Sequence, residues 1–305
     1  NSWSTFPSLS LGPRQEHSVV STNEAIWVLG GTIPGGETVS TIEFFNLADQ
    51  TWHSTATPFL QPLNHLNAAV VADKIYILSG LAPRDSSWDA QDLNMVYSPT
   101  EEDSSWTPLA ASPPGTARGA CAVGVYGTKI YLAGGMTYLN SAQDVVDTVT
   151  VYDTASDSWE MLPALPQPRQ HVAGVVIGSK FYVLGGRTDG QLKIQNTVFV
   201  LDVENVGDGW KEMASMPTAR GGLACAGVKE LIYCLGGEGN QQNESGVFGQ
   251  VEVFDTAANA WTSLAEMPVP RHGWGVTAVG DTIFVPGGGV KAGTAPTDYF
   301  DAFTP

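Results

Sequence analysis

The sequence is poor in cysteine and in charge. Its 305 residues include three cysteines, Cys121, Cys225 and Cys234, and so small and odd a number excludes a fold stapled by many disulfides. No CxxC or CxxH spacing is present, so a structural zinc site is not predicted. Only 15% of the residues are charged, and the formal net charge is -17. Because an acidic surface repels phosphate, we expect neither nucleic acid nor a membrane as a partner.

Long hydrophobic runs and helical periodicity are also missing. No apolar run approaches the roughly 20 residues needed to span a bilayer. No segment shows a convincing apolar period of 3.6 residues, which predicts almost no helix. Hydrophobic residues nevertheless make up 43% of the chain. That fraction is enough for a substantial core and excludes a disordered chain.

A short pattern recurs along the chain at intervals of roughly 50 residues. Pairs of glycines end five β-prone runs, and the pair Ser79-Gly80 ends a sixth. The five glycine pairs begin at Gly30, Gly134, Gly185, Gly236 and Gly287. Tryptophans follow the same spacing, at positions 3, 52, 106, 159, 210 and 261. Such a fixed period indicates one structural unit repeated six times.

Each copy reads as four short strands separated by turn residues. In the copy over 219–267 the strands are "RGGLACAGV", "LIYCLGG", "QVEVFD" and "AWTSLAEMP". The paired glycines, the aromatic residue just before them and the tryptophan after them together resemble the kelch repeat over essentially the whole chain. The resemblance implies an all-β, six-bladed β-propeller of four-stranded antiparallel blades, in which the first strand of each copy lines the central channel.

The two ends of the chain complete one blade. The final segment, "TDYFDAFTP", matches a third strand, and the opening segment, "NSWSTFPSL", matches a fourth. We therefore expect the N-terminal strand to close the ring by joining the C-terminal blade, which leaves no open sheet edge and is compatible with a monomer. We predict a single domain over 1–305, with blades over about 14–61, 62–112, 117–165, 168–216, 219–267, and 270–305 plus 1–9.

The basic residues fall on one face of the predicted propeller. Loops that precede first strands, and loops between second and third strands, open on the same end of the channel. Two arginines, Arg84 and Arg187, lie in loops of the second kind, and five begin first strands: Arg14, Arg118, Arg169, Arg220 and Arg271. Four histidines also lie near the start of first strands: His17, His65, His171 and His272. The sequence thus predicts a channel mouth lined by guanidinium and imidazole groups.

Such a mouth would suit an anionic ligand. Guanidinium groups bind carboxylate, sulfate and phosphate oxygens, and an exposed aromatic ring can stack on a sugar. Trp88, in the loop between the second and third strands of blade 2, and Trp274 have no scaffold explanation, and Tyr138 is a further candidate. We predict that the seven arginines, His272 and these aromatics bind an anionic small molecule or acidic oligosaccharide, with no cofactor.

A catalytic alternative uses the same mouth. Glu16, His17, His65 and His171 all fall there, and an imidazole with a pKa near 6.5 can move a proton at neutral pH. Some six-bladed kelch proteins are sialic-acid mutarotases. The resemblance therefore implies, as an alternative, a cofactor-independent lyase, epimerase or mutarotase that acts on a carboxylate-bearing substrate.

Metal centres of similar proteins are not reproduced in the sequence. Galactose oxidase is similar in its repeats, but it needs two histidines and a tyrosine cross-linked to a cysteine, and no cysteine here lies in a mouth loop beside a suitable tyrosine. The E-x-x-x-D-x-x-x-H iron site of the nitrile-specifier proteins is absent too. A cluster of His17, His65 and His272 is geometrically conceivable, but no metal is predicted. A third hypothesis, implied by the kelch domains of ubiquitin-ligase adaptors, is a protein-interaction module for acidic peptides.

Two features bear on the compartment. Cys225 and Cys234 lie on neighbouring strands of one hairpin, where a disulfide is possible if they face each other, and two small buried thiols are the alternative. Asn243 begins the glycosylation sequon Asn243-Glu244-Ser245. Together with the acidity and the low lysine content, these features favour secretion, and a cytoplasmic location is the alternative.

Overall fold

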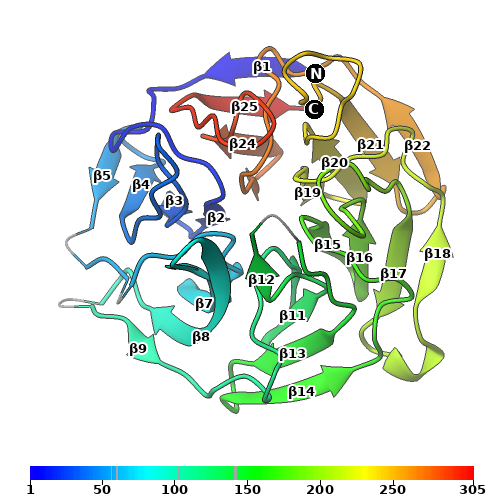
Figure 1. The fold of residues 1–305 in the computed structure, drawn as a ribbon, viewed down its shortest axis with the longest axis horizontal. Helices are drawn as coiled ribbons and strands as arrows, with labels where there is room; N and C mark the ends of the chain where they lie inside the picture. Colours follow the sequence, from blue (N-terminus) through cyan, green and yellow to red (C-terminus); the bar gives the residue numbers. More distant parts are fainter. Residues whose placement is uncertain (56, 60, 102–103, 141–142) are drawn as a thin grey trace.

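A computed structural model describes residues 1–55, 57–59, 61–101, 104–140 and 143–305. Six antiparallel sheets surround a central axis like the blades of a propeller, and the chain visits them in sequence order (Figure 1). Within the described ranges, helix is limited to one 3₁₀ turn, η1 (Val206–Asp208). The predicted all-β, six-bladed fold is confirmed.

Each blade runs from an inner strand at the axis to an outer strand at the rim. Blade 1 contains β2 (Ser18–Ser21), β3 (Ala25–Leu29), β4 (Ile42–Asn46) and β5 (Trp52–Ser54). Blade 2 contains β6 (Ala68–Val71), β7 (Lys74–Arg84), β8 (Ser87–Tyr97) and β9 (Thr107–Pro108). Blade 3 contains β10 (Ala122–Tyr126), β11 (Lys129–Ala133), β13 (Val149–Asp153) and β14 (Ser158–Leu162).

The second half of the ring repeats this order. Blade 4 contains β15 (Ala173–Ile177), β16 (Lys180–Leu184), β17 (Val198–Asp202) and β18 (Lys211–Met213). Blade 5 contains β19 (Ala224–Val228), β20 (Leu231–Leu235), β21 (Val251–Asp255) and β22 (Ala260–Ser263). Blade 6 contains β23 (Thr277–Val279), β24 (Thr282–Pro286) and β25 (Phe300–Thr304), and its outer strand is the N-terminal β1 (Ser2–Thr5).

The ring closes as the sequence predicts. Strand β1 pairs antiparallel with β25, with Trp3 opposite Phe303, so the two termini lie side by side (Figure 1). The pairing joins the two ends of the chain in one sheet. Blade 6 therefore depends on both ends of the chain for its four strands.

Blade 2 departs from the expected pattern of four short strands. Its second and third strands continue past the blade as a long hairpin, β7–β8, and the two-residue strand β12 (Tyr138–Leu139) of the next repeat pairs with β8. The sequence segment "APRDSSWDA" contains turn residues and was expected to be a loop, so the placement of Trp88 in a loop is wrong. Trp88 lies on β8, held between Pro83 on β7 and Leu139 on β12.

The paired glycines allow neighbouring blades to approach closely. At Gly30, φ is +59°, a conformation that favours glycine. An added Cβ there would lie 2.5 Å from the carbonyl oxygen of Leu63 in the next blade. The N–H of Gly31 donates a hydrogen bond to the same oxygen at 2.8 Å. The di-glycine is thus the point at which one blade is tied to the next.

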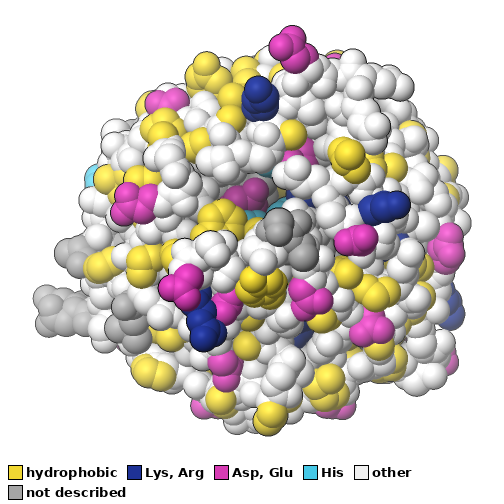
Figure 2. Space-filling view, in the orientation of Figure 1, with side chains coloured by type: hydrophobic (Ala, Val, Ile, Leu, Met, Phe, Trp, Pro, Cys, Tyr) yellow, Lys and Arg dark blue, Asp and Glu magenta, His cyan; other side chains and the backbone are white. Residues whose placement is uncertain are grey.

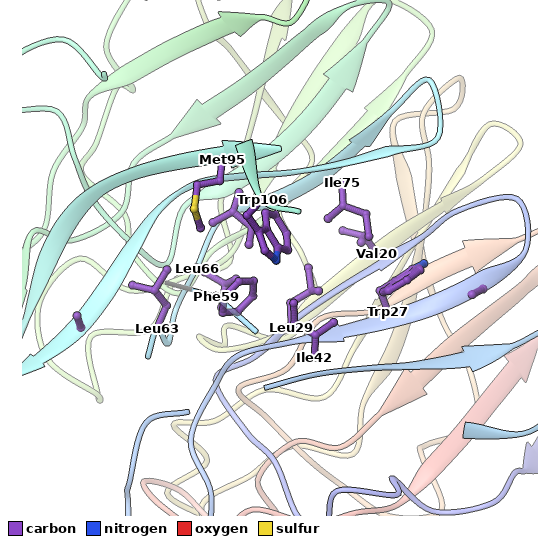
Figure 3. Packing of buried hydrophobic residues seen from close by; sticks show 13 residues of the cluster. Val20, Trp27, Leu29, Ile42, Phe59, Leu63, Leu66, Ile75, Met95 and Trp106 are labelled. Atoms are coloured by element: carbon purple, nitrogen blue, oxygen red, sulfur yellow. The ribbon is translucent and has the colours of Figure 1, made fainter. Parts of the chain in front are cut away.

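Apolar side chains fill the spaces between blades. Between blades 1 and 2 they include Trp27, Leu29, Phe59, Ile75 and Trp106 (Figure 3). The outer-strand tryptophans of blades 1 to 5 also link neighbouring blades, because each indole N–H donates to a carbonyl oxygen of the preceding blade. Trp210, for example, donates to Pro163 at 2.8 Å, and Trp261 donates to Ala214 at 2.8 Å.

The cysteines divide into a pair and a single thiol. Cys225 and Cys234 face each other across β19 and β20 and form a disulfide. Cys121 is free and buried, and burial raises the pKa of its thiol. Among the described residues, no helix has the length and apolar character to cross a lipid bilayer.

Candidate functional site

A closed ring of backbone hydrogen bonds surrounds one end of the central channel. Each blade supplies one residue to this ring, two places after the arginine that begins its inner segment or, in blade 2, two places after Leu63. The N–H of each ring residue donates to the carbonyl oxygen of the ring residue in the preceding blade, over 2.6–3.1 Å. The six ring residues are Glu16, His65, Ala120, His171, Gly222 and Gly273.

All six ring residues adopt the left-handed conformation. Their φ angles lie between +49° and +60°, a region that costs a non-glycine residue about 1 kcal/mol or more. Two positions are glycine and one is alanine, but three carry large side chains despite that cost. Backbone strain of this kind is often found where side chains serve a function.

The three large side chains of the ring meet at the channel end. Nε2 of His65 lies 3.1 Å from Nε2 of His171 and 3.2 Å from Oε2 of Glu16. The nearest ligand-type atoms of the three residues all lie within 4.8 Å of one another. The small residues Ala120, Gly222 and Gly273 leave the room that these side chains occupy. We call Glu16, His65 and His171 the triad.

The triad separates two hollow spaces. On one side is the central channel, of about 580 Å³, which all six ring residues line. On the other side is a cavity of about 620 Å³ that is open to solvent and has the triad at its floor. Figure 2 shows this hollow at the centre of one face, with histidine and acidic side chains inside it. The triad is therefore accessible from the mouth.

Side-chain amides fix the orientation of both imidazoles. Nδ1 of His65 lies 2.5 Å from Oδ1 of Asn64, and Nδ1 of His171 contacts Oε1 of Gln170. Since an amide oxygen only accepts, each Nδ1 carries the proton and each neutral Nε2 has a free lone pair. The amide nitrogen of Gln170 in turn donates to Oε1 of Gln143 at 2.7 Å, an oxygen that also accepts from Arg187.

Burial keeps the two imidazoles neutral. It lowers the pKa of His65, although the Glu16 carboxylate partly offsets the effect. Burial also holds the pKa of His171 well below its ordinary value, and the charge of Arg187 adds to this. Both rings are therefore neutral at neutral pH, with the proton on Nδ1 and a lone pair on Nε2.

The cavity wall combines an aromatic ring with polar groups. Trp88 is half-buried and lies 5.7 Å from the His65 ring, measured between centroids. Pro83 and Leu139 extend this apolar side of the cavity wall. Pro83 and Trp88 belong to the part of the hairpin β7–β8 that continues past the blade. The remaining lining is polar, with Gln15, Thr38, Ser86, Ser87, Gln143, Gln191 and Thr294 among its side chains.

The five arginines that begin the inner segments do not line this cavity. Arg14, Arg118, Arg169, Arg220 and Arg271 are at most 2% exposed and point into their own blades. Arg118 donates to the carbonyl oxygens of Gly134 and Thr116, each at 2.6 Å. Arg271 donates to those of Gly287 and Tyr299, each at 3.1 Å. Their geometry is that of scaffold residues, and ligand binding by them stays a prediction.

One position on the third strand of each blade completes the environment of its arginine. In three blades this position supplies a carboxylate: Glu43 lies 3.8 Å from Arg14, Glu252 lies 2.9 Å from Arg220, and Asp301 lies 2.6 Å from Arg271. Thr150 accepts from Arg118, and Phe199 lies under the Arg169 guanidinium. Blade 2 has Leu63 in place of the arginine and Met95 in place of the partner, and both lie in the apolar core.

Arg187 does reach the cavity, but with its charge already paired. It follows a di-glycine, and Glu238 occupies the same place in the next blade. The two form a buried ion pair, and Nδ1 of His272 lies 3.4 Å from Glu238. Burial alone would raise the pKa of Glu238, but His272 and Arg187 outweigh it and hold the pKa at about 2. Burial likewise disfavours the charge of His272, but Glu238 outweighs it and raises the pKa.

The other predicted site residues lie apart from the triad. His17 is buried against the carbonyl oxygen of Pro286 at 3.0 Å, and burial lowers its pKa to about 3. His272 contacts the carbonyl oxygen of Lys291 at 2.9 Å. The grouping of His17, His65 and His272, which the sequence analysis considered without predicting a metal, is thus not the one that the structure brings together. Trp274 packs in the core between blades 5 and 6.

Three predicted residues are on the outer surface. Arg84 is exposed at the tip of the hairpin and pairs with Asp89 at 3.0 Å. Tyr138, on β12, is 37% exposed, and its hydroxyl accepts from Asn140 at 2.6 Å. Asn243 lies exposed in the long loop of blade 5, where its Oδ1 accepts from Ser245. Its glycosylation stays a prediction.

Sequence reasoning missed Asn64, Gln143, Gln170 and Glu238 as parts of the site. Asn64 and Gln170 directly precede the triad histidines, and Glu238 directly follows a di-glycine, as Arg187 does. Alignment of the six copies by position would have revealed these three. Gln143 lies in a variable loop, and no repeat position points to it.

Comparison with known proteins identifies the family. A family model described as "Attractin/LZTR1 beta-propeller" matches residues 1–204, and one described as "KLHDC2/KLHL20/DRC7 Kelch-repeats domain" matches residues 163–288. Kelch-like protein terF of Aspergillus terreus is 37% identical over an alignment of 316 positions, which covers 99% of this chain and 68% of that protein. Kelch-like protein 40 of Xenopus tropicalis is 26% identical over 74% of this chain and 35% of that protein. Alpha-scruin of Limulus polyphemus is 30% identical over 46% of this chain and 15% of that protein. The chain therefore belongs to the kelch-repeat β-propeller family.

Proposed function

We propose that the propeller binds a small, uncharged, hydroxyl-bearing molecule, such as a sugar or polyol, in the cavity above the triad. The observation that carries this proposal is the solvent-open cavity of about 620 Å³ with acceptor groups at its floor. Cavities of a few hundred Å³ that combine apolar walls with a few convergent polar groups are typical ligand sites. The Glu16 carboxylate and the two Nε2 lone pairs would accept hydrogen bonds from ligand hydroxyls.

The charges around the cavity favour a neutral ligand over an anion. Its lining includes the carboxylates of Glu16, Glu37, Asp85 and Glu238. Arg187 is the arginine of that lining, and Glu238 already neutralises it. A carboxylate or phosphate entering the cavity would meet more negative than positive groups. The anionic ligand predicted from the sequence is therefore the less supported choice.

Trp88 supports a ring-shaped ligand. An aromatic face of this kind packs against the apolar face of a sugar ring, while the hydroxyls on its edge reach polar partners. The hairpin β7–β8, with Pro83 opposite Trp88, fixes the indole at the cavity wall. The Trp88 ring contacts the His65 ring, so the aromatic wall of the cavity adjoins the hydrogen-bond acceptors at its floor.

A binding screen tests the proposal. Neutral monosaccharides and inositol are titrated by calorimetry beside glucuronate and sialic acid. We expect binding by a neutral ligand that weakens roughly three- to tenfold in Trp88→Ala. Met161→Ala, which removes an exposed side chain from the outer strand β14, is the control and should bind normally. Tighter binding of the carboxylates, or an unchanged affinity in Trp88→Ala, would contradict the proposal.

The other hypotheses from the sequence stay open as alternatives. A lyase, epimerase or mutarotase would have to turn over a substrate in the same cavity. A module for acidic peptides would have to bind them at a mouth that carries several carboxylates, which the charge pattern disfavours.

A further inference from the structure

The triad places three hydrogen-bond acceptors against one another. Because both Nδ1 atoms donate to amide oxygens, the two Nε2 atoms face each other as lone pairs at 3.1 Å. The Glu16 carboxylate lies 3.2 Å from one of them. Three electron-rich atoms at these distances repel one another unless a cation lies between them.

The distances suit a small metal ion. With metal–ligand bonds of about 2.1 Å, neighbouring ligand atoms lie about 3.0 Å apart in octahedral and about 3.4 Å apart in tetrahedral coordination. Two edges of the triad, His65 Nε2 to His171 Nε2 at 3.1 Å and His65 Nε2 to Glu16 Oε2 at 3.2 Å, fall between these values. Nearest ligand atoms all lie within 4.8 Å of one another, so a modest side-chain rotation would close the third edge.

The surroundings of the histidines are those of metal ligands. A metal-binding histidine usually donates its second ring N–H to an oxygen acceptor, which fixes the tautomer and aims the free nitrogen at the ion. Asn64 does this for His65, and Gln170 does it for His171. Gln170 is itself held by Gln143, whose oxygen accepts from the guanidinium of Arg187. This series of hydrogen bonds places the proton of His171 on Nδ1 and leaves its Nε2 without one.

The triad also leaves space for a further ligand. It lies at the floor of the solvent-open cavity, so an ion bound there would have three protein ligands and one open side. Sites that bind substrates or water at a metal have this arrangement, whereas structural sites are closed. An ion would enter through the mouth.

We propose that Glu16, His65 and His171 bind one divalent first-row transition-metal ion. Two imidazoles and one carboxylate favour Zn²⁺ or its neighbours, because Mg²⁺ and Ca²⁺ prefer oxygen ligands. The inference rests on the proposed function in that the ion lies at the floor of the same ligand cavity. With the ion bound, the triad lone pairs are occupied, and the ion would receive a ligand hydroxyl at its open side in their place.

Metal binding is tested without any organic ligand. The protein is treated with EDTA, dialysed and titrated with Zn²⁺ by calorimetry, and Co²⁺ is added separately to record visible absorption bands. We expect one equivalent of Zn²⁺, and a loss of affinity of about 100-fold or more in His65→Ala and His171→Ala. Glu16→Gln should lose at least about tenfold. Alanine is suited to these variants, because Ala120 adopts the same conformation in the ring.

A surface histidine supplies the control. His53 on β5 is exposed and lies beside Asp49, so it could bind metal non-specifically. His53→Ala should retain one equivalent of Zn²⁺ with unchanged affinity and the same Co²⁺ spectrum. Circular dichroism verifies that each variant is folded. The metal site is overturned if wild-type protein binds no Zn²⁺ at micromolar concentrations, or if His65→Ala and His171→Ala bind it as tightly as wild type.

The two proposals fail in different ways. If sugars or inositol bind to EDTA-treated protein and Zn²⁺ does not, the metal inference is wrong and the proposed function stands. If Zn²⁺ binds with the expected dependence on the triad but no neutral ligand binds, the metal site stands and the proposed function is wrong.

Discussion

Substitution of one ring glycine should disturb the triad without touching any of its residues. Gly273 has φ +60° and faces the Glu16 side chain. A Cβ added there would lie 2.8 Å from Cδ of Glu16 and closer still to Oε1. The obstructing atoms belong to the end of a flexible side chain. Gly273→Ala should therefore fold and displace the carboxylate from the triad.

Gly222 offers a matched control for the backbone strain. It occupies the equivalent ring position, with the same φ of +60°. The nearest atoms to an added Cβ lie 3.6 Å away, which is an ordinary contact. Both substitutions force alanine into the left-handed region, at a cost of about 1 kcal/mol each. Only Gly273→Ala adds the collision with Glu16.

The two variants are compared by urea denaturation and by Zn²⁺ titration. We expect both to lose about 1 kcal/mol of unfolding free energy. Zn²⁺ affinity should fall at least about tenfold in Gly273→Ala, because a carboxylate ligand is moved, and should be nearly unchanged in Gly222→Ala. Equal Zn²⁺ affinities in the two variants would refute the placement of Glu16 in the site. Unfolding of Gly273→Ala alone would show that the ring tolerates no movement at this point.

Two further predictions concern the scaffold. Arg220→Leu should cost about 3–5 kcal/mol of unfolding free energy in urea, because it leaves the buried Glu252 carboxylate unpaired. Adding Glu252→Met, the residue that blade 2 has at this position, should recover at least half of the loss. A double variant no more stable than Arg220→Leu would contradict the scaffold role. The hydrogen bonds from Lys180 and then Asn205 lower the pKa of Asp202. The stability that this carboxylate contributes should thus be present above the unfolded pKa of about 3.9 and be lost as pH falls. The difference in urea midpoint between wild type and Asp202→Asn should therefore shrink from pH 7 to pH 3. A difference that stays constant would exclude this linkage.

The fold could be predicted because its signals are local and repeated. Each di-glycine marks a close approach of two blades, and each tryptophan marks an outer strand. The spacing thus located the six repeats, while the resemblance to the kelch repeat implied their arrangement as blades and the two end segments indicated the closure by β1. The long hairpin β7–β8 could not be predicted, because Asp85, Ser86 and Ser87 read as loop residues although they form the tip of two paired strands.

The site was predicted only in part, because the sequence gives the face on which a residue lies but not the direction of its side chain. Arg220 begins an inner segment at the mouth but turns back to Glu252 inside its blade. The acidic residues on the third strands were the available signal for this. His17 and His272 lie one place after and one place before the ring position, which is why they do not join His65 and His171.

The ring around the channel end is built from peptide groups alone, so its hydrogen bonds impose no demand on side-chain identity beyond tolerance of a positive φ. The ring thus has six equivalent positions, of which three carry ionisable side chains in this chain and three carry alanine or glycine. We therefore expect single substitutions at these ring positions to change the groups at the channel end of this propeller while its blades remain as they are. For the same reason, the six ring positions are the first to compare when the ligand of a related sequence is to be inferred.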